Sequence, residues 1–163
     1  MAFTIRNAQI ADLEEILVVF EKAKAYMRAH GNHKQWADGY PNEAVFREDI
    51  RREKLFIVED EEGIAAVFYA AVEADPSYQK IDGAWLNDEP YTVIHRIASN
   101  RNRSGVATYI LNWVFEQTGN VRIDTHEDNL PMHELMKKLG FTRCGIIYLA
   151  NGDPRIAYQK IRK

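Results

Sequence analysis

The most constraining feature of the sequence is a strand-like segment that leads through a polar loop and one glycine into a helix-like segment. Residues 91–98 are apolar and rich in β-branched side chains, and residues 99–104 (SNRNRS) are polar and basic. Apolar positions then recur at helical spacing over residues 106–117, and a second strand-like segment follows at 121–125. Because two strands joined by a helix pair in parallel within one sheet, this part of the chain predicts an α/β domain.

The remaining segments add further strands and helices to this unit. Asp12 and Glu15 form a cap-like pair at the start of an amphipathic segment that Gly31 ends, and Asn42 can cap a second helix. Strands are expected at residues 3–6, 55–59, 64–72, 91–98, 121–125, 141–150 and 155–161, and helices at 12–30, 42–52, 106–117 and 131–139. We expect residues 1–163 to form a single domain with one mixed sheet.

Composition and charge narrow the class of protein. The chain has a net charge of −3 and a pI of about 6.0, whereas nucleic-acid-binding proteins usually carry a basic face. No apolar run reaches the length of a bilayer span, and the first residues lack the apolar core of a signal peptide. The single cysteine, Cys144, fits a reducing compartment. We therefore expect a cytoplasmic protein with no nucleic-acid or membrane partner.

The junction before residue 106 has the chemistry of an anion site. The N-terminus of a helix presents unpaired N–H groups and a partial positive charge, and Gly105 lets the backbone approach a ligand closely. Arg101 and Arg103 add charge that can grip a phosphate, and Asn102 and Ser104 can donate hydrogen bonds. A solvated turn accounts for the same residues about equally well. The Gly-Lys-Ser/Thr of a nucleotide-binding P-loop is absent.

A second segment supports the anion-site interpretation. Asn102-Arg103-Ser104-Gly105-Val106-Ala107 fills the frame Q/R-x-x-G-x-G/A, and Asn129 precedes a short helix that closes on Lys138-Leu139-Gly140-Phe141. Together these motifs resemble those of the GNAT superfamily of acyl-CoA-dependent N-acetyltransferases, over about residues 91–148. The resemblance implies a mixed, mostly antiparallel central sheet of six to seven strands, flanked by about four helices.

The resemblance also implies acetyl-CoA as co-substrate. The diphosphate would lie on the backbone amides of residues 102–107, and the pantetheine arm would pair with the strand ending at Ile97 and Ala98 as an added strand. Homodimers are common in the family, so a homodimer is a candidate assembly. The residues that the resemblance assigns to cofactor binding are Ile97, Ala98, Arg101, Asn102, Arg103, Ser104, Gly105, Val106, Ala107 and Asn129.

The sequence departs from the family pattern at two positions. Asn102 stands where the family has Gln or Arg. Met136 stands where the family has a tyrosine that is taken to protonate the leaving thiolate. The usual acid therefore cannot be carried over to this chain.

Three residues are candidates for acid–base catalysis, which attack of an amine on a thioester requires. Asp124 matches a position where some family members carry a catalytic Glu, although a structural carboxylate is the commoner role. The intrinsic pKa of a histidine such as His95 suits a general base near neutral pH. A structural role, as a core histidine bonded to a carbonyl, is slightly favoured over the catalytic one. Tyr148 could replace the missing acid, or it could be an ordinary aromatic on a sheet face. Neither a metal site at His126 and His133 nor a nucleophilic Cys144 is expected.

Contacts to the acceptor substrate are expected from aromatic residues in the variable loops, with plain packing as the alternative. These residues are Trp36, Tyr40, Trp85 and Tyr91. The resulting hypothesis is an N-acetyltransferase that acetylates a primary amine of a small molecule, amino acid or peptide by direct attack in a ternary complex. A catalytically inactive acyl-CoA sensor is the alternative, and a nucleic-acid-binding domain that uses Arg101 and Arg103 is a weaker one.

Overall fold

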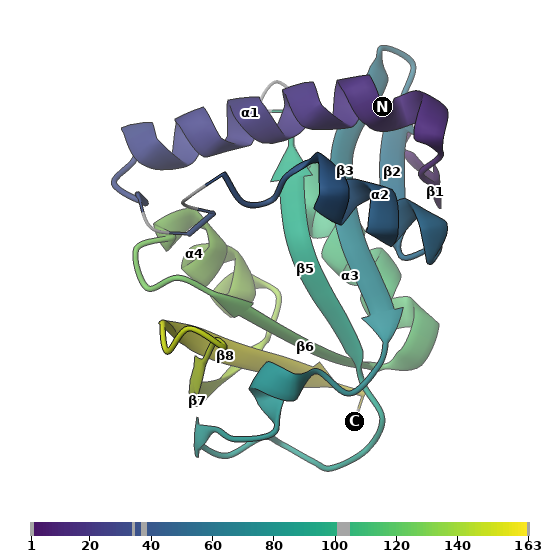
Figure 1. The fold of residues 1–163 in the computed structure, drawn as a ribbon. Coiled ribbons are helices and arrows are strands. Elements are labelled where there is room, and N and C mark those ends of the chain that lie inside the picture. The colour runs from purple at the N-terminus through teal and green to yellow at the C-terminus, as the bar shows by residue number, and fades with distance from the viewer. Residues whose placement is uncertain (1, 34, 37–38, 101–104, 163) are drawn as a thin grey trace. The chain divides into compact units, whose positions relative to one another are not determined.

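The computed structural model describes residues 2–33, 35–36, 39–100 and 105–162 (Figure 1). The α-helices of these residues are α1 (Leu13–Ala29), α2 (Glu43–Arg51), α3 (Val106–Thr118) and α4 (Leu130–Lys138). The strands are β1 (Thr4–Asn7), β2 (Leu55–Asp60), β3 (Gly63–Val72), β4 (Asp82–Gly83), β5 (Thr92–Ser99), β6 (Asn120–Thr125), β7 (Thr142–Tyr148) and β8 (Pro154–Ile161). Each expected helix and strand is present. The described residues form eight strands rather than six or seven, because two-residue β4 has no sequence signal of its own.

The strands form one mixed sheet in the order β1-β2-β3-β5-β6-β8-β7-β4. β5 pairs with β6 in parallel, with Thr92 opposite Val121 and Ile94 opposite Ile123. This confirms the parallel pairing predicted from the strand–helix–strand segment. The pairs β1–β2, β2–β3, β4–β7, β6–β8 and β7–β8 are antiparallel, so the sheet is mostly antiparallel as expected.

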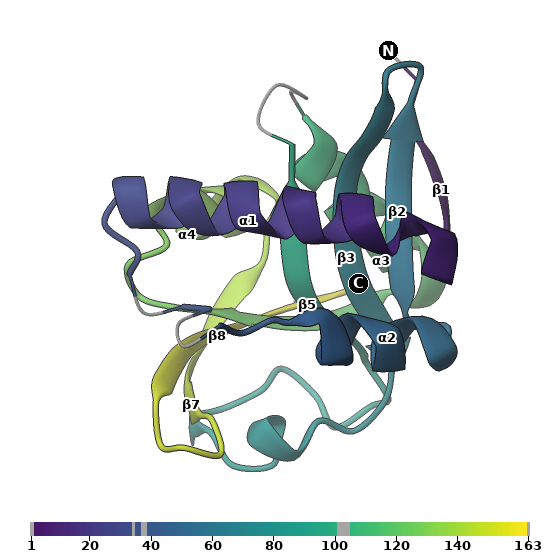
Figure 2. The ribbon, with the colours of Figure 1, turned by 45° about the horizontal axis from the view of Figure 1, so that its top comes forward.

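The chain divides into two compact units, and the first comprises residues 1–70 and 95–111. In this unit α1 and α2 lie on the same side of β2 and β3 (Figure 2). The apolar face of α1 meets that of α2 through Phe20 and Phe46, whose ring centroids are 4.6 Å apart. Both side chains are fully buried, and so are the β2 residues Leu55 and Ile57. Burial of these apolar side chains holds the helices to the strands.

The two N-terminal helices begin in different ways. The side chain of Asn42 accepts a hydrogen bond from the Val45 N–H at 3.1 Å, which confirms it as the N-cap of α2. The predicted cap at Asp12 is wrong in detail, because Asp12 ends a preceding 3₁₀ turn and its side chain makes no cap bond to α1. Its carboxylate instead accepts from the Gln9 N–H at 2.8 Å and from both terminal nitrogens of Arg6.

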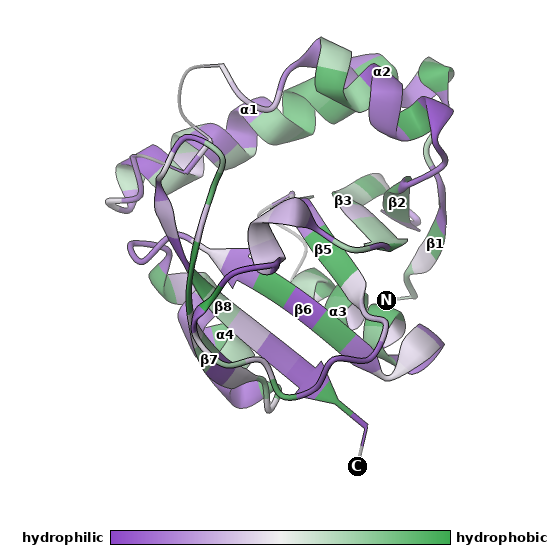
Figure 3. Cartoon of the chain, turned by 60° about the horizontal axis from the view of Figure 1, so that its bottom comes forward, coloured by the Kyte–Doolittle hydropathy of each residue, from purple (hydrophilic) through white to green (hydrophobic). Residues whose placement is uncertain are grey.

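The second unit comprises residues 71–94 and 112–163. Its strands β6 and β8 present two different faces. Tyr158 on one face bonds to His133 of α4, whereas Arg122 and Gln159, which are directly opposite each other in the register, bond to the connection between β3 and β5. That connection, residues 73–91, passes over β6 and β8 in Figure 3. It includes a short 3₁₀ turn (Pro76–Tyr78) and β4.

Candidate active site

The predicted cofactor loop lies between β5 and α3. Its residues Arg101, Asn102, Arg103 and Ser104 lie outside the described part of the chain. Gly105 has a left-handed backbone, with φ of 79°, and an added Cβ would meet no atom within 4 Å. Glycine is therefore required here by conformation rather than by space. Tyr109 donates its N–H to the Gly105 carbonyl at 3.1 Å and so begins the helix, in which Val106 is buried and Ala107 half-buried.

β5 departs from regular strand geometry at Arg96. This residue has a φ of 52°, a left-handed conformation that is uncommon for a residue with a side chain. Consecutive strand residues normally point to opposite faces, yet His95 and Arg96 both contact the ring of Tyr69. The His95 ring centroid lies 5.7 Å from that of Tyr69, and the Arg96 guanidinium carbon lies 4.5 Å from it. The irregular backbone thus brings an imidazole and a guanidinium to one ring, just before Ile97 and the buried Ala98.

Arg96 is the centre of a polar cluster in the first unit that sequence analysis missed. Its Nε and Nη2 donate to one carboxylate oxygen of Asp49 at 3.0 and 2.8 Å, and its Nη1 donates to the Tyr40 hydroxyl at 2.7 Å. Asp49 is only 6% exposed, and burial raises its pKa against the opposing effect of Arg96 and of nearby His95. The structure therefore brings together His95 and Tyr40, two predicted site residues. The sequence did not mark Asp49 as a site residue. It lies on helix α2, and the apolar residues of that helix already explained why one face of the helix is buried.

Trp36, another predicted substrate residue, packs against α1. Its ring packs on Phe20 of α1 with centroids 5.2 Å apart, and its φ is 60°. These contacts match the packing role that sequence analysis kept as the alternative for this residue.

In the second unit, Asp124 accepts a hydrogen bond from the Tyr78 hydroxyl at 2.6 Å. Tyr78 is 1% exposed, and burial, followed by the charge of Asp124, raises its pKa well above the ordinary value. The hydroxyl is therefore a fixed donor to the carboxylate. The Asp124–Tyr78 pair was not predicted, because 46 residues separate the two side chains and no periodic pattern links them.

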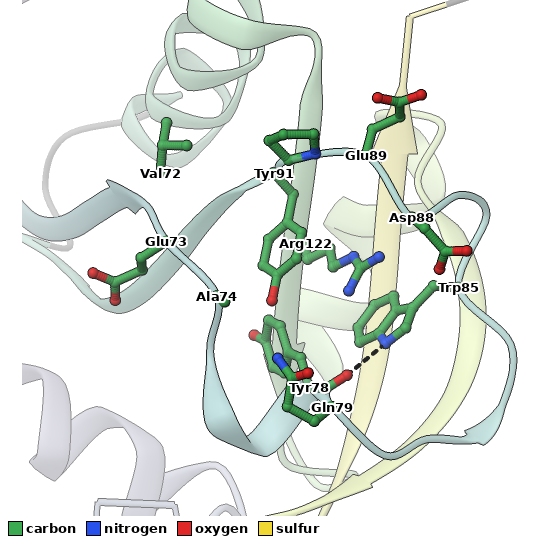
Figure 4. A pocket seen from close by; sticks show the side chains of 11 residues that line it. Val72, Glu73, Ala74, Tyr78, Gln79, Trp85, Asp88, Glu89, Tyr91 and Arg122 are labelled. Atoms are coloured by element: carbon green, nitrogen blue, oxygen red, sulfur yellow. Dashed lines mark hydrogen bonds between the residues drawn. The ribbon is translucent and has the colours of Figure 1, made fainter.

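Arg122, on the same face of β6, is held between two of the predicted substrate residues. Its guanidinium carbon lies 4.2 Å from the Trp85 ring and 4.0 Å from the Tyr91 ring. Trp85 in turn donates its indole N–H to the Tyr78 carbonyl at 3.0 Å, and the Tyr91 hydroxyl accepts from the Asp75 N–H at 3.0 Å. These rings line a cavity of about 460 Å³, shown in Figure 4, together with Arg122.

Comparison with solved structures identifies the fold. A crystal structure of a GNAT-family acetyltransferase from Streptococcus agalactiae 2603 matches with a TM-score of 0.89 and 30% sequence identity, over 99% of this chain and 96% of that one. The chain belongs to the GNAT family of acetyltransferases. A candidate acetyltransferase from Staphylococcus aureus Mu50 is 26% identical with a TM-score of 0.72, over 98% of this chain and 99% of that one.

A GNAT-family acetyltransferase from Listeria monocytogenes 4b F2365 is 20% identical and shares the fold, with a TM-score of 0.72 over 98% of this chain and 95% of that one. No protein-family model and no curated protein matches the chain.

In this GNAT protein Asn129 starts α4. Its side chain accepts from the Met132 N–H at 3.4 Å, a long N-cap bond. Met136, which replaces the family's tyrosine, is fully buried and has no proton to donate. Tyr148, the predicted substitute acid, is 51% exposed at the end of β7. The role of Tyr148 as the general acid stays a prediction.

His133 of the GNAT chain contacts the backbone of His126. Its Nε2 is 3.1 Å from the His126 carbonyl and its Nδ1 is 2.5 Å from the Tyr158 hydroxyl. A carbonyl can only accept, so Nε2 is the donor to His126. Among the residues that the structure describes, no three His, Cys, Asp or Glu side chains gather as a metal site would require. No helix within the same residues is long and apolar enough to cross a bilayer.

Proposed function

We propose that this chain is an acetyl-CoA-dependent N-acetyltransferase that acts on a primary amine of a small molecule, amino acid or peptide. The observation that carries the proposal is its 30% identity and TM-score of 0.89 with a GNAT-family acetyltransferase over nearly the whole of both chains. The left-handed glycine at the first turn of α3 supports it, because bare N–H groups at a helix N-terminus suit a diphosphate. We also propose that residues 1–163 act as one acyltransferase domain.

Acetyl-CoA supplies an activated acyl group as a thioester. In the proposed reaction the amine nitrogen forms a bond to the thioester carbonyl carbon, the carbon–sulfur bond breaks, and the thiol leaves with a proton. The substrate ammonium must first lose a proton. Asp124 and His95 remain the candidates to accept that proton, directly or through water. Asp124 is the more constrained of the two, because the Tyr78 hydroxyl occupies one of its oxygens at 2.6 Å.

The enzymatic test is transfer of radiolabelled acetyl groups from acetyl-CoA to a panel of amines, amino acids and peptides. We expect acetylated product from at least one acceptor, and loss of product in Gly105→Glu, because a charged side chain at a left-handed position would be strained and would repel a diphosphate. The matched control is Gly31→Glu, since Gly31 follows α1 with a φ of 87° and an added Cβ there meets nothing within 4 Å. Product from Gly105→Glu at the wild-type rate would contradict the proposed cofactor loop.

The second candidate function is an acyl-CoA sensor, and Met136 favours it because its buried thioether cannot protonate a leaving thiolate. Binding of acetyl-CoA without transfer to any member of the panel would support the sensor. Replacement of Met136 by tyrosine then separates the two functions. An inactive sensor gains no activity from that change, whereas an enzyme that lacks only the acid gains turnover.

A further inference from the structure

The cavity in the second unit combines Trp85 and Tyr91, two of the predicted acceptor-substrate residues, with charged side chains that have no assigned role in the acetyl transfer. None of the described residues that were assigned to cofactor binding lines it. The cavity is lined by Val72, Glu73, Ala74, Tyr78, Gln79, Trp85, Asp88, Glu89, Pro90, Tyr91 and Arg122.

One lining residue is a buried cation without a carboxylate partner. Arg122 is 5% exposed, and its hydrogen bond from Nη2 goes to the Asn87 carbonyl at 2.7 Å. Its Nε has no hydrogen-bond acceptor. Within the described residues no carboxylate oxygen comes within ion-pair distance of Arg122. The Trp85 and Tyr91 rings and, at longer range, the charge of Asp88 supply the remaining compensation. Buried charges in proteins are normally paired, so the guanidinium is left with unused capacity for an anion.

The opposite charge lies around the same cavity. Glu73 lies to one side of the aromatic residues in Figure 4, and Asp88 and Glu89 lie to the other. Asp88 and Glu89 are exposed and Glu73 is half-buried, so their carboxylates attract cations while they remain hydrated. The cavity thus has a cation at its base, Arg122, and three carboxylates at its rim. The aromatic rings of Tyr78, Trp85 and Tyr91 form its walls.

The walls of this cavity are fixed in advance by buried polar side chains. Gln159, which is fully buried, donates to the Asn87 side chain at 3.3 Å and accepts from the Leu86 N–H at 2.8 Å. Asn120 donates to the Asn87 side chain and to the Pro90 carbonyl, both at 3.1 Å. A long connection held this firmly is typical of a binding loop, because preorganisation lowers the entropic cost of binding.

From these observations we propose that the cavity binds a small zwitterion of the α-amino-acid class. The carboxylate of the ligand faces Arg122, its ammonium group faces Glu73, Asp88 and Glu89, and its side chain lies against Tyr78, Trp85 and Tyr91. A simple anion would be repelled by the three rim carboxylates. A simple cation would leave Arg122 uncompensated. This binding does not depend on acetyl-CoA, so it stands or falls separately from the proposed transfer.

The test uses three matched probes without acetyl-CoA: L-phenylalanine, phenethylamine, which lacks the carboxylate, and 3-phenylpropionate, which lacks the ammonium. Binding is followed by NMR at the indole N–H signal of Trp85, identified by its loss in Trp85→Phe. We expect phenylalanine to bind at least about tenfold more tightly than either analogue, a difference of about 1.4 kcal/mol. The other common amino acids are titrated in the same way to define the preferred side chain.

Charge variants give the sharper result. Glu89→Gln and Asp88→Asn should weaken phenylalanine and phenethylamine and strengthen phenylpropionate, because only the ammonium gains from the rim. Both side chains are exposed, so folding is not at risk. Arg122→Met should weaken phenylalanine and phenylpropionate but not phenethylamine. Glu62→Gln, at the exposed hairpin tip of the first unit, is the control and should change nothing.

Two results would overturn the proposal. One is equal binding of phenylalanine and of either analogue. The other is the absence of a shift in the Trp85 signal with every α-amino acid at about 10 mM, which is about ten times a dissociation constant of 1 mM.

Discussion

The left-handed conformation of Arg96 determines what its side chain and that of His95 can touch. A regular strand would send these neighbours to opposite faces, and Asp49 would then lie buried without its guanidinium partner. Backbone strain of this kind persists only where surrounding contacts enforce it. Here the two bonds to Asp49 and the one to Tyr40 do so.

Removal of one member of this pair should be costly. Asp49→Ala would leave the 12%-exposed Arg96 guanidinium without its carboxylate, and we expect a loss of about 3 kcal/mol in the free energy of unfolding. The control, Glu43→Ala, breaks an exposed pair with Arg47 and should cost under about 1 kcal/mol. Urea denaturation measures both. Equal losses would show that the buried pair contributes no more than a surface one.

The carboxylate of Asp12 makes stability depend on pH in a defined direction. The hydrogen bond from Arg6 lowers its pKa below the ordinary 3.8, so the folded state holds its proton less tightly than the unfolded state. The stabilisation is complete above the unfolded pKa and is lost as pH falls through the lower folded pKa. Asp12→Asn should therefore cost about 1 kcal/mol at pH 7 and progressively less below about pH 4. Thermal unfolding from pH 7 to pH 3 tests this, and a constant difference would contradict it.

The conformations and partners of single residues were harder to predict from the sequence than the helices and strands. Gly105 was expected only to let the backbone approach a ligand closely, and its left-handed conformation is a finding of the structure. Arg122 and Asp124 are two residues apart on β6, so strand alternation places them on one face. Their partners Tyr78 and Trp85 could not be foreseen, because those contacts depend on the path of a 19-residue connection whose sequence has no periodicity.

At the scale of elements, the shortest strand is also the least tolerant of substitution. β4 lies so close to β7 that a Cβ on Gly145 would come within 2.2 Å of the Asp82 carbonyl oxygen, and a Cβ on Gly83 equally close to that of Cys144. Both positions have positive φ as well. Backbone atoms cannot yield as a flexible side chain can, so any side chain here separates the two strands.

Gly145→Ala should therefore detach β4 and loosen the cavity formed by the same connection. We expect a clear fall in the unfolding midpoint and faster hydrogen exchange at the Ala84 N–H, which donates to the Cys144 carbonyl at 3.1 Å. Gly152→Ala serves as control, because it is also a left-handed turn position but has open space around it. If the two variants exchange alike, close strand approach is not the cause.

Helices and long strands followed from sequence because their signals are local. Asn42, placed ahead of an apolar period, fixed the start of α2. The same logic failed at Asp12, because Arg6 on a neighbouring strand competes for the carboxylate. A capping pattern considers only nearby residues, so it does not predict a partner such as Arg6 that the tertiary structure supplies.

At the scale of the whole molecule, binding of a co-substrate should increase the free energy of unfolding. A ligand that binds only the folded state at about one hundred times its dissociation constant adds about 2.7 kcal/mol. We expect acetyl-CoA to raise the thermal midpoint of the wild type and of Glu62→Gln, and not that of Gly105→Glu. No shift with the wild type would contradict the proposed cofactor.

The parallel pair in an otherwise mostly antiparallel sheet was predictable, because a helix of a dozen residues between two strands permits little else. The cavity was not. Its walls come from one connection and its anchors from β6 and β8, so no single stretch of sequence contains it.

Because the walls of the cavity and the side chains that hold them come from different segments, exchange of one segment for that of another protein is restricted. Residues 73–91 cannot be exchanged as a unit, because a foreign loop would remove the bonds that Asn120, Arg122 and Gln159 make to Asn87. These buried side chains would then keep the bond between Gln159 and Asn120 but lose their partners in the loop. A graft that carries these three sheet residues along with the loop should fold where the loop alone does not. New ligand preferences in this chain must therefore arise by exchange of paired segments, or by substitution of exposed carboxylates such as Glu89.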